Sequence, residues 1–360
     1  MALPAFVARR LGQDAYSKRI AKGLDNAYDR AETDAVDVSS LRAVVFSDHH
    51  RGRGDGADDF RRCEQAYCAA LGWYLEHGYE LWLLGDVEEL WENRPKHVVE
   101  RYGRVLALER DFGARLRRFF GNHDMAWRRE KNVRRFLTEH LPGARVGEAL
   151  RLTVTDGGRP LGTLFLVHGH QGTLDSGNLL VVPFSRFVVR FIWAALQRAR
   201  GFANTSPATD AVLRGKHDIA MAAWADAHPE RTVLLAGHTH RPVFPGQFPP
   251  DAAALAAERE AAYRAATGDE LPGARAELEL ARVRVARAEA YEAPELERPC
   301  YFNTGCCSFG DGDVTGLELD GGKVRLVRWL EDGRSASPRE LAAAELQAVL
   351  GAVTGELPAV

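Results

Sequence analysis

Five short clusters of histidine, aspartate and asparagine stand out because these residue types can bind metal ions. They are Asp48-His49-His50, Gly85-Asp86, Gly121-Asn122-His123-Asp124, His168-Gly169-His170 and Gly237-His238-Thr239-His240. Seven of the twelve histidines lie in these clusters, so the histidines are concentrated in a few short segments. Taken singly, such motifs are more often turns or ordinary buried histidines. Here each of the five clusters follows an apolar run, and their joint occurrence indicates one shared site.

The types and spacing of these residues favour a centre with two metal ions. Imidazole, carboxylate and amide oxygen suit first-row divalent metals better than calcium or magnesium. In an extended segment residues i and i+2 face the same way, so Asp48 and His50 can bind one ion while the histidine between them points elsewhere. His238 and His240 project together by the same logic. Two ions about 3.5–4 Å apart need a bridging carboxylate, and Asp86 is the best placed.

A strand–helix–strand–helix–strand pattern positions the first three clusters. Strands are predicted at 41–46, 79–84 and 114–120, with helices at about 58–77 and 96–112 between them. This spacing implies a parallel sheet covered by helices. Open α/β sheets build their sites at the carboxyl ends of strands, which is where each cluster falls.

The second half of the chain predicts more strands and two helical insertions. Strands are expected at 150–155, 163–169, 231–237, 300–305, 314–320 and 323–330, and helices at about 180–200, 209–227 and 338–350. Residues 251–298 are rich in Ala, Glu and Arg and predict a helical hairpin. The alternating charge of this hairpin favours a solvated cover or a contact between two copies in a homodimer over a catalytic role.

The length of 360 residues predicts about two domains of roughly 150 residues each. We divide the chain into an N-terminal helical arm at 1–35, a main domain at 36–330, and a C-terminal helix and tail at 331–360. Helical inserts within the main domain are expected at about 177–228 and 251–298.

Charge and cysteine content exclude several classes of protein. Forty-seven basic and fifty acidic residues give a net charge of −3, whereas a protein that coats nucleic acid carries a basic excess. Five cysteines without a CxxC pair argue against a disulfide framework. A small buried pair is the favoured reading of Cys306-Cys307 over a redox role. No membrane-spanning run or signal peptide is evident, so we expect a cytoplasmic protein.

These motifs resemble the calcineurin-like metallophosphoesterase superfamily. The pattern of that family, DxH, GDxx(D/E), GNH(D/E), (G)H and GHxH, reads here as SDHH, GDVEE, GNHD, VHGH and GHTH over about 41–242. The resemblance implies a four-layer α/β/β/α sandwich with helical inserts. It also implies hydrolysis of a phosphomonoester or phosphodiester by a hydroxide that bridges two divalent transition-metal ions. Mn2+ is the first choice, with Fe or Zn as alternatives.

The resemblance also assigns roles to individual residues. It implies that one ion takes Asp48, His50, Asp86 and His240. It implies that the other takes Asp86, Asn122, His168 and His238. His123 would donate a proton to the leaving oxygen, with Asp124 orienting it. His170 stays as an alternative ligand to His168.

Residues beside the metal-binding loops are candidates for substrate contact. Arg51, Arg53, Asn93 and Arg94 flank these loops, and an arginine fork could bind a second phosphate of the substrate. The alternative is that they belong to solvated loops.

The apolar and basic stretch at 183–202 leaves two interpretations open. It is either a core helix with snorkelling arginines, or a lid or interfacial helix that contacts a lipid or a membrane surface. The layout is nearest to the UDP-2,3-diacylglucosamine hydrolase branch, which implies a nucleotide-linked lipid substrate and a place at the inner face of the membrane. That branch commonly carries arginine at the position of His123, so the histidine here favours a conventional phosphatase or phosphodiesterase. A nuclease of the same superfamily is the further alternative.

Overall fold

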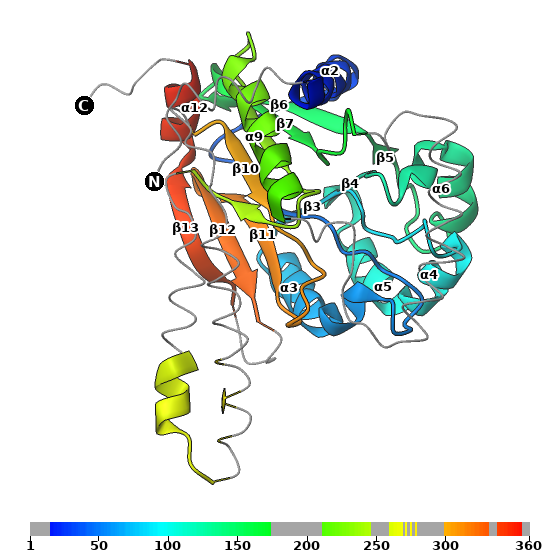
Figure 1. Cartoon of the computed structure of the whole chain (residues 1–360). Helices are drawn as coiled ribbons and strands as arrows, with labels where there is room; N and C mark the ends of the chain where they lie inside the picture. The colour runs from blue at the N-terminus through cyan, green and yellow to red at the C-terminus, as the bar shows by residue number, and fades with distance from the viewer. Residues whose placement is uncertain are drawn as a thin grey trace.

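The computed structural model describes residues 15–173, 211–245, 259–268, 271, 274–275, 278, 299–330 and 337–354. Two β-sheets pack face to face, and helices cover their outer faces (Figure 1). The predicted α/β class and its four-layer order are therefore confirmed.

One sheet has seven strands and carries the first three sequence clusters. Its strands are β2 (Arg42–Phe46), β3 (Glu80–Leu84), β4 (Leu116–Phe119), β5 (Val146–Gly147), β11 (Val314–Asp320), β12 (Lys323–Trp329) and β13 (Arg339–Glu345). They follow the order β13-β12-β11-β2-β3-β4-β5. The pairs from β2 to β5 are parallel, and those from β13 to β2 are antiparallel.

The other sheet has six strands and carries the remaining two clusters. Its strands are β1 (Glu32–Asp37), β6 (Ala149–Asp156), β7 (Arg159–Val167), β8 (Val233–Ala236), β9 (Pro242–Val243) and β10 (Tyr301–Thr304). They follow the order β1-β6-β7-β8-β10-β9. Because β7, β8 and β10 are parallel, the loops after β7 and β8 leave the sheet at the same edge.

Helices cover both sheets. On the six-stranded sheet lie α2 (Ala15–Arg30), α9 (Ala211–Ala227) and α12 (Leu346–Thr354). On the seven-stranded sheet lie α3 (Glu64–Glu76), α4 (Pro95–Arg101), α5 (Gly103–Asp111) and α6 (Glu130–Phe136). Three short 3-10 turns, η1 (Asp59–Arg62), η2 (Gly113–Arg115) and η3 (Met125–Arg128), connect these elements.

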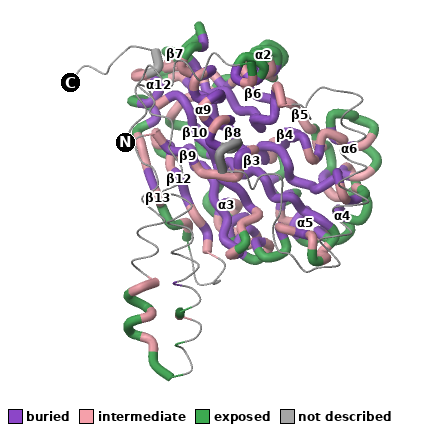
Figure 2. Tube along the Cα trace, viewed as in Figure 1, coloured by how far each residue is buried: buried purple, intermediate pink, exposed green. Residues whose placement is uncertain are grey.

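The alternation of side chains along β2 explains the layered core. Ala43 and Val45 pack toward the six-stranded sheet, whereas Val44 and Phe46 pack toward the helices on the other side. Successive side chains of a strand face opposite sides, so a fully apolar strand can serve two cores at once. Figure 2 shows the resulting buried centre of both sheets.

Both terminal boundaries predicted from the sequence are wrong. The boundary at residue 35 cuts through β1, which pairs in parallel with β6. Its sequence ETDAVD is polar because the strand lies exposed at the sheet edge, so it has no hydrophobic alternation. The helix predicted at 338–350 begins only at Leu346, since 339–345 form β13 beside β12. Residues 32–37 and 339–345 are therefore strands of the sandwich.

Several expectations fall on residues that the structure does not describe. Residues 174–210 contain the 183–202 stretch and much of the 177–228 insert, and they lie outside the described residues. Most of the predicted hairpin at 251–298 does as well, although 259–265 are helical. Among the described residues, no helix is long and apolar enough to cross a membrane.

Candidate metal centre

The five clusters meet at the carboxyl ends of β2, β3, β4, β7 and β8. The Nε2 atoms of His50 and His240, which are 190 residues apart, lie 3.0 Å from each other. The Nε2 atom of His168 lies 3.1 Å from Asp86 Oδ2. The parallel strands of both sheets thus bring the predicted ligands together, as expected for an α/β sheet.

Among the described residues, three groups of side chains could hold a metal ion, and two of them correspond to the two predicted ligand sets. One group is Asp48, His50 and His240, and another is Asp86, His168 and His238, with ligand atoms within 4.8 Å of one another. Asp86 Oδ2 lies 3.8 Å from His50 Nε2 as well as 3.1 Å from His168 Nε2. Its carboxylate therefore stands between the two groups, where a bridging ligand belongs.

Several ligand atoms are buried without a hydrogen-bond partner. They are Asp48 Oδ1, Asn122 Oδ1 and His168 Nε2. Buried polar atoms are almost always satisfied, because leaving one unpaired costs about 1–3 kcal/mol. Three such atoms in one cluster of carboxylate, amide and imidazole groups fit divalent cations, which would complete their coordination.

The backbone at the ligands adopts an unusual conformation. Five predicted ligands have positive φ: Asp48 at 54°, His50 at 51°, Asp86 at 51°, His238 at 69° and His240 at 56°. Residues other than glycine pay about 1–3 kcal/mol for this conformation, and they keep it mainly at functional sites. The expectation that these segments are extended is therefore wrong. Asp48 and His50 still share one candidate metal group, whereas His238 and His240, which were expected to project together, belong to two different groups. The intervening His49 is buried against the rings of Phe60 and Tyr67.

The glycines of the motifs allow the ligand loops to approach one another closely. A Cβ atom on Gly121 would lie 2.2 Å from Asp86 Oδ1. A Cβ atom on Gly237 would lie 2.5 Å from Asp48 Oδ2. Any side chain at either position would displace the carboxylate of a candidate ligand, which gives a physical reason for the glycine in the GNH and GHTH patterns.

Outer hydrogen bonds fix the orientation of the ligands. His168 Nδ1 lies 2.9 Å from the carbonyl oxygen of Leu84 and donates to it, which leaves Nε2 facing the site. His50 Nδ1 lies 3.1 Å from Glu89 Oε2. Asp48 Oδ2 accepts hydrogen bonds from Ser47 Oγ and from the backbone N–H of His238, so Oδ1 stays available.

His123 is oriented by Glu89 and not by Asp124. Its Nδ1 lies 2.5 Å from Glu89 Oε2, and its ring stacks on Trp91 at a centroid distance of 4.2 Å. Asp124 instead accepts hydrogen bonds from two backbone N–H groups, those of Gly121 at 2.6 Å and Val87 at 2.9 Å. The predicted role of Asp124 is therefore wrong, because its carboxylate holds the loops of the site in place.

Glu89 is a residue of the candidate site that the sequence analysis missed. It binds both a metal ligand, His50, and the predicted proton donor, His123. A signal was present, since Glu89 is the last residue of the GDVEE motif. Burial opposes ionisation of Glu89, but His123 and His50 outweigh it and lower the pKa of this carboxyl to about 2.

The electrostatics of the site couple acids to histidines. Burial alone would lower the pKa of His50, yet Glu89, Asp86 and Asp48 raise it to about 10. Burial also opposes protonation of His168, whose pKa Asp86 and Asp48 raise to about 9. Divalent cations would take the place of these protons, so metal binding releases them.

The residues predicted to contact substrate separate into buried and exposed ones. Arg51 is buried and pairs with Glu109, so its predicted role as a phosphate clamp is wrong. Asn93 is buried as well, and its side-chain N–H donates to the Glu89 carbonyl oxygen at 3.1 Å. Arg94 is exposed at the start of α4, and its contact with substrate stays a prediction.

Four further residues singled out in the sequence can also be placed. His170, the alternative ligand, is buried and belongs to none of the three metal-binding groups. Arg53 is exposed and pairs with Asp55 at 2.6 Å. Cys306 and Cys307 are buried free thiols, in line with the predicted apolar pair.

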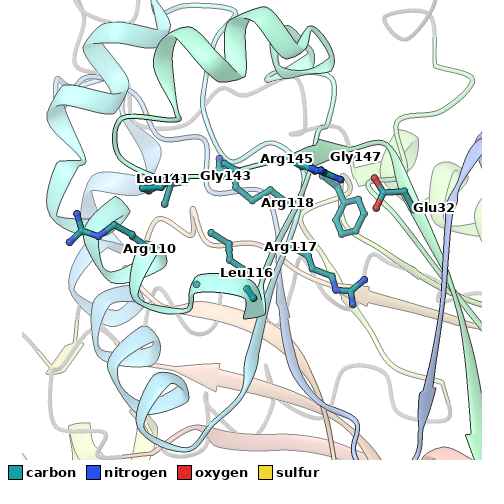
Figure 3. A pocket seen from close by; sticks show the side chains of 14 residues that line it. Glu32, Arg110, Leu116, Arg117, Arg118, Leu141, Gly143, Arg145 and Gly147 are labelled. Atoms are coloured by element: carbon teal, nitrogen blue, oxygen red, sulfur yellow. The ribbon is translucent and has the colours of Figure 1, made fainter.

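A cavity of about 560 Å3 lies away from these ligands, beside β4 and the loop that leads into β5 (Figure 3). None of the predicted metal ligands lines it. Two of its guanidinium groups already have partners: Arg117 pairs with Asp34 at 2.6 Å, and Arg118 with Glu88 at 2.6 Å. This cavity is therefore separate from the candidate metal centre.

Comparisons with known proteins found no sequence match and a distant structural similarity. No family model and no curated protein matches the sequence. Among solved structures, the chain is similar to a dimetal phosphatase from Danio rerio. The identity is 8% and the TM-score 0.35, over 84% of this chain and 98% of that one. At this level of similarity, the activity of that protein says nothing about the substrate of this chain.

Proposed function

We propose that this chain is a metal-dependent phosphoesterase with a dinuclear centre that hydrolyses a phosphomonoester or phosphodiester. The observation that carries the proposal is the position of Asp86 between two groups of histidine and aspartate ligands. The unpartnered buried atoms of Asp48, Asn122 and His168 support it.

The residues that would hold each ion follow from the two groups. One ion would take Asp48, His50, His240 and Asp86, and the other Asp86, His168, His238 and Asn122. When bound, two divalent cations lower the pKa of water and neutralise charge on phosphoryl oxygens. Mn2+ is our first choice, with Fe or Zn as alternatives.

In this proposal His123 gives a proton to the leaving oxygen. Glu89 accepts the Nδ1 hydrogen, so Nε2 is the atom free to act on substrate. Burial opposes protonation of His123, but Glu89 and Asp86 outweigh it and raise its pKa, which favours the protonated ring. Its side chain is 15% exposed, whereas those of Asp48 and His168 are fully buried. Trp91 also fixes this loop, since its Nε1 donates to the Asn122 carbonyl oxygen at 2.7 Å.

His123 also lies in a third group, with His50 and Asp86, that could hold a metal ion. Its contacts favour the role of proton donor instead. Glu89 occupies Nδ1 and the indole of Trp91 covers one face of the ring. This arrangement fixes a general acid without using it as a ligand.

A panel of substrates tests the proposal. The full chain is stripped of metal and reloaded with Mn2+, Fe2+ or Zn2+. It is then assayed on p-nitrophenyl phosphate, bis-p-nitrophenyl phosphate, cyclic nucleotides, a nucleotide-linked lipid and single-stranded DNA. We expect about two ions per chain by elemental analysis and metal-dependent hydrolysis of a simple mono- or diester. Failure to bind metal, or inactivity on every phosphate ester with all three metals, would contradict the proposal.

The panel also separates the alternatives. Activity confined to the nucleotide-linked lipid would favour a lipid-precursor hydrolase, and activity confined to DNA would favour a nuclease. The net charge of −3 argues against the second. The basic and apolar stretch at 183–202, which motivates the first, lies outside the described residues.

A further inference from the structure

The N-terminal helix α2 contacts the loop that carries one of the metal ligands. In Figure 1, α2 lies beside α9 on the outer side of the six-stranded sheet. The hydroxyl of Tyr16 in α2 lies 2.6 Å from Nδ1 of His217 in α9. Nε2 of His217 in turn lies 2.8 Å from the carbonyl oxygen of Gly169, directly after the ligand His168. A continuous line of hydrogen bonds thus runs from the helix to the metal-binding loop.

The chemistry of these groups fixes the direction of each hydrogen bond. A carbonyl oxygen can only accept, so His217 Nε2 must carry the hydrogen that it shares with Gly169. A neutral imidazole carries a hydrogen on only one of its two ring nitrogens, so Nδ1 of His217 accepts from the Tyr16 hydroxyl. The tautomer of His217 is therefore set by both partners at once.

A second set of contacts joins the same helix to the same loop. Arg19 Nε donates to the Gly172 carbonyl oxygen at 2.8 Å. Gly23 and Gly172 pack backbone to backbone, since a Cβ atom on Gly23 would lie 2.3 Å from Gly172 N. A Cβ atom on Gly172, which has a φ of 81°, would lie 2.2 Å from the Arg19 carbonyl oxygen. Both glycines are thus needed for the close approach of helix and loop.

His217 also reaches a ligand on the neighbouring loop. Its ring packs edge-on against the ring of His238, with centroids 4.9 Å apart. His217 therefore contacts the segment of one ligand, His168, through a hydrogen bond and a second ligand, His238, through its ring. These two histidines belong to the same candidate metal group, together with Asp86.

We propose that α2 is a positioning element for one of the two metal ions, and that it acts through Tyr16 and His217 on the ligands His168 and His238. This inference rests on the proposed function, because it assumes that these histidines hold an ion. The other group, Asp48, His50 and His240, is oriented instead by Glu89 through His50. Changes in α2 should therefore weaken the binding of one ion and leave that of the other nearly unchanged.

The decisive variant is Tyr16→Phe, which removes the hydroxyl and keeps the ring. Metal-stripped full-length protein is titrated with Mn2+ by isothermal titration calorimetry. We expect the Kd for one of the two ions to rise by about three- to tenfold, below the 10- to 100-fold seen for direct partners of a ligand. The Kd for the other ion should stay within about twofold. The matched control is Tyr28→Phe, in the same helix, whose hydroxyl donates to Glu230 Oε2 at 2.5 Å.

Two further variants separate positioning from general stability. Gly23→Ala should weaken the binding of the same ion, because the added methyl group pushes Gly172 away. We expect this even though alanine favours a helix more than glycine does. His217→Ala should weaken the binding of this ion more than Tyr16→Phe does. His217→Gln should restore part of the affinity, because its amide N–H can still reach the Gly169 carbonyl oxygen.

The wild-type titration comes first and separates the two proposals. If the wild type does not bind two ions, the proposed function fails, and the positioning role fails with it. If the wild type binds two ions but Tyr16→Phe and Gly23→Ala keep both Kd values, only the positioning role is overturned. The same holds if Tyr28→Phe weakens metal binding as much as Tyr16→Phe does.

Discussion

Two buried clusters of charged side chains lie next to each other in this protein, and they differ in how their charges are balanced. The first is an arginine–glutamate quartet made of Arg51, Arg118, Glu88 and Glu109. Arg118 Nη2 bonds both carboxylate oxygens of Glu88, at 2.6 and 2.7 Å, and Nη1 bonds Glu109 at 3.2 Å. Arg51 pairs with Glu109 and lies over the rings of Phe60 and Tyr67. Two cations and two anions of the chain itself neutralise each other.

The second cluster is the candidate metal centre, which lacks such cations of its own. Its carboxylates are faced by histidines, among them His50 and His240, whose Nε2 atoms converge, and Asp48 Oδ1 and Asn122 Oδ1 have no hydrogen-bond partner. A buried carboxylate needs a cation, because an unpaired buried charge is very costly. Where the chain supplies guanidinium groups the cluster is structural. Where it supplies imidazoles, carboxylates and amide oxygens, the cluster offers the ligand types that suit first-row divalent metals.

Adjacent residues serve the two clusters. Glu88 belongs to the quartet and also accepts a hydrogen bond from Trp127 Nε1 at 2.8 Å. Glu89, the next residue, binds His50 and His123 in the metal centre. Two neighbouring glutamates of one motif thus have different roles, which variants of each cluster can test.

Loss of the carboxylate shared by the two metal groups should have the largest effect. Asp86→Asn removes the anion between them, so we expect lower occupancy at both sites and an activity loss above the 10- to 100-fold typical of outer partners. Elemental analysis and a p-nitrophenyl phosphate assay measure the two quantities. The exposed Asp111→Asn variant is the control. Two ions and full activity in Asp86→Asn would refute the bridging role.

Removal of the proton donor should leave the metals in place. His123→Ala is expected to lower the rate of hydrolysis of an alkyl ester by about 10²–10⁴-fold. The loss should be smaller for an aryl ester, because its leaving group needs no proton. Metal content should stay at the wild-type value, and equal losses for both esters would speak against the role in proton donation.

A variant of the quartet should affect stability and spare metal content. Arg118→Met leaves Glu88 and Glu109 short of a buried cation, which should cost about 3–5 kcal/mol in the free energy of unfolding. Chemical denaturation of the metal-free chain measures this loss, and elemental analysis of the folded protein should still find the wild-type metal content. Metal loss without a change in stability would make the quartet part of the metal centre and end the contrast between the clusters.

Neutralising Glu89 should have the smallest effect of the four and should shift the pH profile. Glu89→Gln keeps the shape of the side chain, and we expect about a 10- to 100-fold loss of activity. Glu89 raises the pKa of His123, so the protonated ring persists to higher pH in the wild type. Activity that requires this proton is present below that pKa and is lost as the pH rises through it. In Glu89→Gln that alkaline limb should move to lower pH, and an unchanged profile would contradict the pairing.

The sequence by itself determined the candidate ligands of the centre and the layers that carry them. Each ligand stands in a short motif directly after an apolar run, such as VVF before Asp48 or LWLL before Asp86. Strand type and strand end are local properties, and parallel strands bring their carboxyl ends together whatever lies between them. The same reasoning gave the fold class, since alternating strands and helices have few compact arrangements.

Only the tertiary structure decided which charged residues face the site. Asp124 is adjacent to His123 in sequence, but its carboxylate turns back to backbone N–H groups, while Glu89, 34 residues away, holds the histidine. Arg51 follows a metal-binding motif, yet its partner Glu109 is 58 residues distant and draws it into the core. The polar edge strand β1 likewise exists because β6 offers it a pairing edge. Such pairings depend on distances through space, which a single sequence does not specify.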